Sequence, residues 1–112
     1  MKKIEAVIKP FKLPAVNEAL HEIGLSGMTV LEVKGFGRQR GYDGTIHDQD
    51  NFDEFQNKLK IEIIVEDKIA KSAVKAIQAA AYSGKIGDGK IFISNIDQVI
   101  RIRTGEKDKD AV

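Results

Sequence analysis

The sequence contains no cysteine, no long apolar run and almost no net charge. The missing cysteine excludes a disulfide framework, a thiolate nucleophile and a cysteine-ligated zinc site. Lys and Arg number 18 against 17 Asp and Glu, so no global field attracts nucleic acid or an anionic membrane. Glu5 and Lys9 interrupt the N-terminal apolar stretch, which is too short for a signal peptide or a membrane span. We therefore expect one cytoplasmic domain covering residues 1–112.

Two stretches alternate between apolar and polar residues, KIEAVI at residues 3–8 and KIEIIV at residues 60–65. Such alternation predicts strands. Apolar residues at helical spacing follow each of them, at 13–23 and at 69–80, and further strands are expected at 28–35 and 90–94. Strand, helix, strand therefore occurs twice. This order predicts an α+β, ferredoxin-like βαββαβ fold with a long loop between the second and third strands.

Two further structural expectations concern the end of the chain and the open face of the sheet. A fifth short strand is expected at 99–103, before a C-terminal tail at about 104–112. With both helices on one face, the other face carries charged residues with a few apolar ones. Such a semi-polar face favours an oligomer.

An acidic segment interrupts the periodic pattern between residues 41 and 57. It contains five acids and no Lys or Arg, and it belongs to a loop that we place at about 39–56. Loops longer than about 12 residues inside a compact domain are usually functional or disordered. Two interpretations remain open, a solvated insertion without a role and an arm that contacts a partner and is mobile without it.

Two motifs near the C-terminus suggest binding of an anion. GKIGDGK at 84–90 offers backbone amides and lysines to an anion, although it lacks the spacing of a Walker P-loop. In IRIR at 100–103, alternation along a strand would place Arg101 and Arg103 on one side, where they could clamp phosphate. A plain glycine-rich turn and a charge-protected edge strand are the structural alternatives. If both motifs face one cleft, they favour a polyphosphate ligand.

A third motif, KGFGRQRG at 34–41, imitates the start of an RNA-recognition signature. Arg38, Gln39 and Arg40 stand where that signature continues with residues that include stacking aromatics, so we favour a glycine hinge over RNA binding. Histidines show no metal-ligand spacing. No set of residues suggests a catalytic triad.

Together these stretches resemble the PII nitrogen-regulatory signal transduction family, through MKKIEAVIKPFKL, GMTVLEVKGFGRQRG, KLKIEIIVEDK, GKIGDGKIF and VIRIRTGE. The resemblance covers residues 1 to about 107. It implies a homotrimer that binds ATP or ADP in clefts between subunits and 2-oxoglutarate beside Mg-ATP, and that regulates a transporter or enzyme of nitrogen metabolism through its T-loop, the long loop between the second and third strands. It implies no catalytic residue.

The resemblance also implies binding residues. The nucleotide would contact Val7, Gly27, Met28, Thr29, Gly35, Gly37, Arg38, Ile64, Gly87, Asp88, Gly89, Lys90, Arg101 and Arg103. The 2-oxoglutarate would contact Gln39, Arg40, Gly41, Lys58 and Gly87, and Gln39 would also give an oxygen to Mg²⁺.

The acidic loop departs from the family. Asn51 replaces a tyrosine that is uridylylated in many members, Gln49 replaces a serine that is phosphorylated in others, and His47 replaces an arginine that plugs an ammonium channel. An ammonium channel is thus a doubtful partner, and we expect a partner with a basic contact surface. The alternatives are a paralogue that senses only ATP and ADP and controls another transporter, and a slow ATPase.

Overall fold

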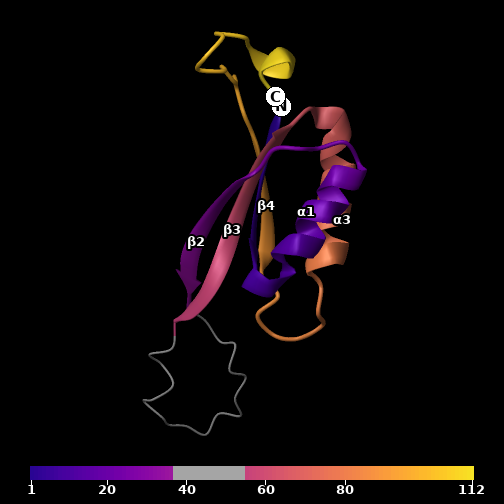
Figure 1. Ribbon diagram of the computed structural model, residues 1–112, viewed down its shortest axis with the longest axis vertical. Helices are drawn as coiled ribbons and strands as arrows, with labels where there is room; N and C mark the ends of the chain where they lie inside the picture. The colour runs from indigo at the N-terminus through magenta and orange to yellow at the C-terminus, as the bar shows by residue number, and fades with distance from the viewer. Residues whose placement is uncertain (37–54) are drawn as a thin grey trace, which may run out of the picture.

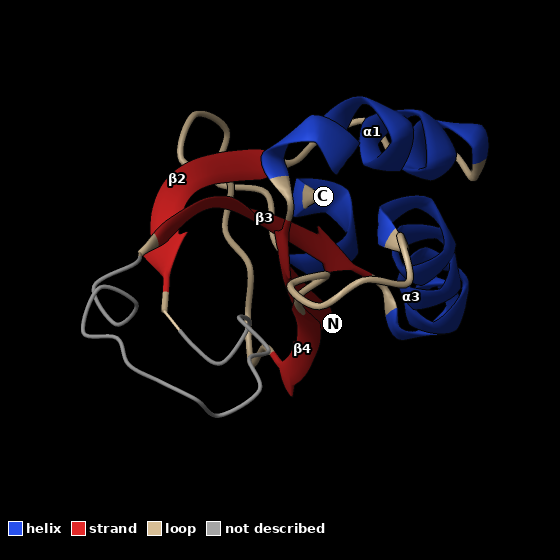
Figure 2. Ribbon diagram, turned by 90° about the horizontal axis from the view of Figure 1, so that it is seen from below, coloured by secondary structure: helices blue, strands red, loops and turns tan. Residues whose placement is uncertain are grey.

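The computed structural model describes residues 1–36 and 55–112 as an antiparallel sheet with two helices on one face (Figures 1 and 2). The strands follow the spatial order β2-β3-β1-β4. This arrangement confirms the ferredoxin-like βαββαβ fold. The elements are β1 (Lys2–Ile8), the short 3-10 helix η1 (Pro10–Lys12), α1 (Leu13–Glu22), β2 (Thr29–Gly35), β3 (Gln56–Val65), α3 (Asp67–Ala81), β4 (Lys90–Asn95) and the 3-10 helix η2 (Asp108–Ala111).

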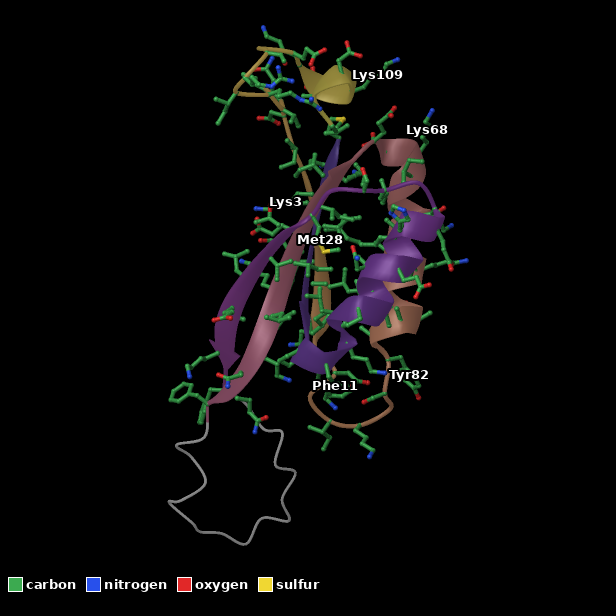
Figure 3. All side chains as sticks on the ribbon, viewed as in Figure 1. Lys3, Phe11, Met28, Lys68, Tyr82 and Lys109 are labelled. Carbon is green, nitrogen blue, oxygen red and sulfur yellow. The ribbon has the colours of Figure 1, made fainter. Side chains whose placement is uncertain are left out.

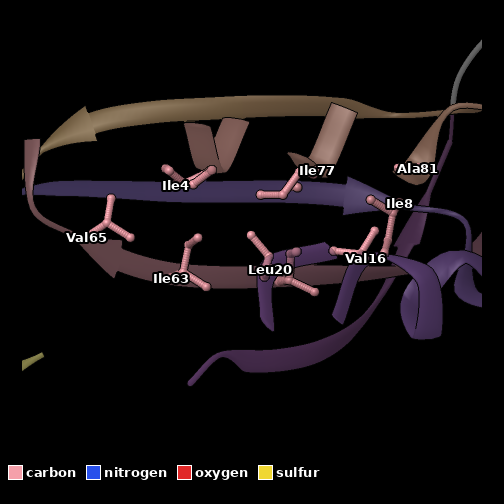
Figure 4. Packing of buried hydrophobic residues seen from close by; sticks show 11 residues of the cluster. Ile4, Ile8, Val16, Leu20, Ile63, Val65, Ile77 and Ala81 are labelled. Atoms are coloured by element: carbon pink, nitrogen blue, oxygen red, sulfur yellow. The ribbon is translucent and has the colours of Figure 1, made fainter. Parts of the chain in front are cut away.

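The core lies between the sheet and the helices, as the alternation in β1 and β3 predicts (Figure 4). Side chains that alternate along a strand point to opposite faces, so every second residue of β1 and β3 faces the helices. The helices contribute one apolar stripe each. The buried residues are Ile4, Ala6 and Ile8 from β1, Ile61, Ile63 and Val65 from β3, Val16 and Leu20 from α1, and Ala73, Ile77 and Ala81 from α3.

The opposite face of the sheet carries a cross-strand cluster of charges. Lys60 Nζ lies 3.3 Å from the Glu5 carboxylate and 3.7 Å from that of Glu62, while Lys3 Nζ lies 3.5 Å and 3.6 Å from the same two groups. Because β1 and β3 are paired with Glu5 opposite Glu62, each carboxylate has a lysine beside it. This confirms the semi-polar character of the open face.

The structure adds to or corrects the expected element boundaries at three places. The chain forms no strand at 99–103, because Ile100 makes only an isolated bridge to Lys107 and the chain turns at 102–104. The C-terminal tail predicted at about 104–112 contains η2 and folds back on the chain, with the Asp108 N–H donating to the Val99 carbonyl at 2.8 Å. β3 begins at Gln56, earlier than the alternation of residues 60–65 suggested, so the irregular segment ends before it.

The acidic residues 43–54, and with them His47, Gln49 and Asn51, lie outside the described residues. Within residues 1–36 and 55–112, no helix is both long and apolar enough to cross a membrane.

Candidate ligand-binding site

A glycine-rich turn connects α3 to β4 and packs against the end of β1. Gly87 and Gly89 adopt φ values of +96° and +98°, which residues with a Cβ atom rarely adopt. A Cβ atom on Gly89 would lie 1.7 Å from the carbonyl oxygen of Val7. Glycine is therefore required at 89 both by the backbone conformation and by the close approach to β1. Figure 3 shows the turn with Tyr82 at one end and Phe11 nearby.

The Asp88 carboxylate is hydrogen-bonded to residues at the start of the same turn. One of its oxygens accepts the N–H groups of Ser83 and Gly84 at 2.8 Å and 2.9 Å. The other accepts the Ser83 hydroxyl and lies 3.3 Å from Lys9 Nζ. The hydrogen bond from the Ser83 hydroxyl, followed by those from the Ser83 and Gly84 amides, holds the pKa of Asp88 well below its usual range.

Lys58 approaches the same turn from β3. Its Nζ donates to the carbonyl oxygen of Gly87, and the residue is only 8% exposed. Burial lowers the pKa of Lys58, and the charge of the nearby Lys9 lowers it further. Both lysines line a hollow of about 350 Å³ beside Pro10, Phe11 and Gly87. The Asp88 carboxylate offsets one of the two ammonium charges, and the remaining positive charge favours an anion there.

A first group of the predicted nucleotide residues meets at this end of the sheet. These residues line a second hollow of about 530 Å³ next to the lysine-lined one. It is bordered by the apolar side chains of Phe36, Ile86 and Phe92. The predicted residues are Val7, Gly35, Gly87, Asp88, Gly89 and Lys90, with Lys58 beside them.

A second group lies at the other end of the sheet. A hollow of about 720 Å³ there is lined by Gly27, Met28, Thr29, Ile64 and Arg101. Lys58 and Ile64 lie near opposite ends of β3, which places the two hollows on the order of 20 Å apart at the usual rise of a strand. A single chain thus carries two separate sets of candidate residues.

The expectation that Lys90 and Arg101 face one cleft is therefore wrong for one chain. β4 runs away from Lys90 as an extended strand, so the residues after it emerge at the far end of the sheet. Arg101 and Arg103 also do not share one side of a strand, since Arg103 lies within the turn at 102–104. The Arg101 guanidinium donates to the Ala111 carbonyl at 3.4 Å. Arg103 is exposed.

Other predicted residues cannot be placed, and two contacts were not anticipated. Gly37, Arg38, Gln39, Arg40 and Gly41 lie outside the described residues. Sequence reasoning missed the roles of Lys9 and Ser83, which contact Asp88. The only signal was a serine at the start of the glycine-rich motif, a position where local side-chain to backbone hydrogen bonds are common.

The comparisons with known proteins agree with the fold. The family model for nitrogen regulatory protein P-II matches residues 1–106. The chain is 54% identical to the nitrogen regulatory protein P-II of Azospirillum brasilense and 56% identical to that of Rhodospirillum rubrum, each over 112 residues and the full length of both proteins.

A solved structure matches the chain over nearly its whole length and points to the same family. The crystal structure of Arabidopsis thaliana PII bound to citrate superimposes with a TM-score of 0.83 at 38% identity, covering 99% of this chain and 91% of that one. The regulators of this family transduce signals without catalysis. By sequence over its whole length and by fold, the chain belongs to the nitrogen regulatory protein P-II family.

Proposed function

We propose that the chain assembles as a homotrimer that distinguishes ATP from ADP and binds 2-oxoglutarate together with Mg-ATP. Which ligands are bound is then communicated to a partner through the T-loop, the loop at about 39–56. The observation that carries this proposal is the division of the candidate residues between two ends of one chain. Neighbouring copies that bring the glycine-rich turn of one chain to Arg101 of the next would complete a cleft. The mixed charged and apolar open face of the sheet suits such an assembly.

The glycine-rich turn is suited to the phosphates. Its positive-φ glycines allow backbone N–H groups to point into one hollow, and Lys90 adds a charge at its edge. Arg101 would add a guanidinium from the neighbouring copy. Removing the γ-phosphate changes the negative charge in this cleft, which gives ATP and ADP different contacts and a basis for distinguishing them.

The lysine-lined hollow is suited to the carboxylates of 2-oxoglutarate. An anion beside Lys58 would offset the two influences that lower its pKa, burial and the charge of Lys9. The relative from Arabidopsis thaliana was solved with citrate, another polycarboxylate. The chain outside residues 37–54 offers no cluster of three or more carboxylate, histidine or cysteine ligands for a metal. In this proposal Mg²⁺ is held by phosphate oxygens and by Gln39, an oxygen donor of the kind this ion prefers.

Calorimetry with ATP, ADP and 2-oxoglutarate tests the sensing model. We expect 2-oxoglutarate to bind only with ATP and Mg²⁺, and Lys58→Ala to reduce that binding far more than it reduces ATP binding. Lys68→Ala, on the exposed surface of α3, is the matched control. Binding of 2-oxoglutarate to the apoprotein with unchanged affinity would contradict the model. Its failure to bind in any condition would leave a sensor of ATP and ADP alone.

The partner is expected to present Lys and Arg to the acidic T-loop. Residues 43–54 contain five acids, so association with such a surface should weaken as salt screens the contact. Deleting residues 43–53 should abolish capture of the partner but spare trimer formation and ATP binding. Asn51, Gln49 and His47 replace residues used for modification or channel plugging in other members, which favours a partner other than an ammonium channel.

A further inference from the structure

The carboxylate of Asp88 has little capacity left for a ligand. Its two oxygens accept the Ser83 hydroxyl and the N–H groups of Ser83 and Gly84, and Lys9 Nζ lies 3.3 Å away. Lys9 Nζ also donates to the Ser83 hydroxyl oxygen at 3.2 Å. Lys9 follows the end of β1, and Ser83 and Gly84 begin the turn. Asp88 lies near the end of the turn. The carboxylate therefore ties the two ends of the turn together and both of them to the sheet.

Neighbouring contacts fix the remainder of the turn. Gly89 rests against the Val7 carbonyl, and Lys58 holds the carbonyl of Gly87. The amides of Ser83 and Gly84 are already used by Asp88, and the Lys85 amide donates to the Ser83 hydroxyl oxygen at 3.2 Å, so only the amides after Lys85 remain for an external anion. A turn held in this way loses little conformational freedom when it binds a ligand, which favours affinity.

We propose that Asp88 is a positioning residue and not a nucleotide ligand: with Ser83 and Lys9 it holds the turn at 83–89 in the shape that presents the later amides to phosphate. This inference rests on the proposed function, because the anion is taken to be the phosphate chain of ATP. It reassigns Asp88, which the family resemblance had placed among the nucleotide-contacting residues. The depressed pKa of Asp88 agrees with the role, since the hydrogen bonds that hold the turn are the ones that stabilise the charged carboxylate.

Positioning of the turn and mere proximity to the phosphates predict opposite signs for one substitution. A direct side-chain contact to the nucleotide would also weaken ATP binding when lost, but it would leave hydrogen exchange in the nucleotide-free turn unchanged. If Asp88 only lay near the phosphates, its negative charge would repel them, and Asp88→Asn would tighten ATP binding. If Asp88 holds the turn, Asp88→Asn weakens ATP binding. The amide of Asn has only one oxygen, so it cannot accept from the four donors that the two carboxylate oxygens serve. In that case Asp88→Asn weakens ATP binding even though it removes a negative charge that would repel the phosphates.

The test measures ATP affinity by calorimetry and the hydrogen exchange of residues 82–90 by mass spectrometry on the full chain. The variants are Asp88→Asn, Ser83→Ala and the double variant, and Asp97→Asn, an exposed acid after β4, is the charge control. We expect Asp88→Asn to weaken ATP binding about tenfold and to speed exchange in the turn of the nucleotide-free protein. Thermal unfolding should change little, because the turn lies outside the buried core. The double variant should be no worse than its weaker-binding parent, since the two residues act as one unit.

Unchanged or tighter ATP binding by Asp88→Asn, or unchanged exchange in the turn, would overturn the inference. Ser83→Ala provides the same two measurements if Asp88→Asn folds poorly. A wild-type chain that bound no ATP would instead refute the proposed function. The exchange of residues 82–90 would still decide whether Asp88 holds the turn.

Discussion

Gly89→Ala is the substitution for which the structure sets the sharpest expectation. Its added Cβ would lie 1.7 Å from the Val7 carbonyl oxygen, at a φ of +98°. Val7 is paired with Lys60 of β3 on one side and with Lys90 of β4 on the other. β1 therefore cannot retreat without breaking both ladders. The glycine-rich turn must move instead.

The size of the effect follows from that displacement. Carbon and oxygen atoms in close non-bonded contact lie about 3.3 Å apart or more, so the turn must shift by more than about 1 Å. Hydrogen bonds tolerate only a few tenths of an ångström, so amides that face phosphate would lose their contacts. Each lost bond to a charged group costs about 1.5 to 3 kcal/mol, and we expect ATP affinity to fall by at least about tenfold.

Calorimetry with ATP and thermal unfolding together provide the assay. Gly24→Ala is the control for backbone strain alone, because Gly24 has a φ of +91° but no atom lies within 4 Å of the place that its Cβ would take. It should cost about 1 to 2 kcal/mol of stability. Gly89→Ala should leave the core folded while ATP binding weakens by at least about tenfold. Undiminished ATP affinity in folded Gly89→Ala would refute the assignment of the turn as the phosphate site.

Three other predictions concern affinity, acid stability and the core. Lys90→Ala should weaken ATP binding by about 1.5 kcal/mol or more through loss of a charge-assisted contact, as calorimetry would show, and unchanged affinity would contradict its placement. The hydrogen bond from Lys60 lowers the pKa of Glu5 below its ordinary value of 4.5, so the ion pair stabilises the fold above about pH 4.5 and this contribution is lost as the pH falls. Urea titrations should therefore show less acid dependence in Glu5→Gln than in the wild type, and equal dependence would argue against the pair. Ile77→Ala should cost about 2 to 5 kcal/mol in the same assay because Ile77 is fully buried; a loss below about 1 kcal/mol would mean that the core collapses around the site.

The sequence predicted the sheet and helices well because their periodicities are strong. Alternation in β1 and β3 placed Ile4 and Ile61 toward the helices, and both are fully buried. It failed at Arg101, where IRIR has the alternation of a strand but finds no partner strand. The chain turns there and pairs only Ile100 with Lys107. Strand formation depends on a neighbour, which a local pattern does not encode.

The candidate site shows a similar limit. The glycine spacing at 84–90 and the family resemblance predicted a binding role for this turn, which the calorimetry described above would test. They did not predict that Asp88 would be surrounded by donors from Ser83, Gly84 and Lys9, because these contacts depend on the three-dimensional path of the turn. Nor did the short interval between Lys90 and Arg101 reveal that an extended strand carries them to opposite ends of the sheet.

In the proposed assembly, the separation of the two hollows makes ligand sensing depend on the concentration of the chain. In the proposed assembly no isolated chain holds a complete cleft, so dilution that dissociates the subunits would also abolish the response to nucleotide. By the reciprocity of linked equilibria, a nucleotide that bridges two copies must strengthen their association by the same factor by which association strengthens its own binding. The abundance of the chain thus becomes an input to the signal, alongside the ligands themselves.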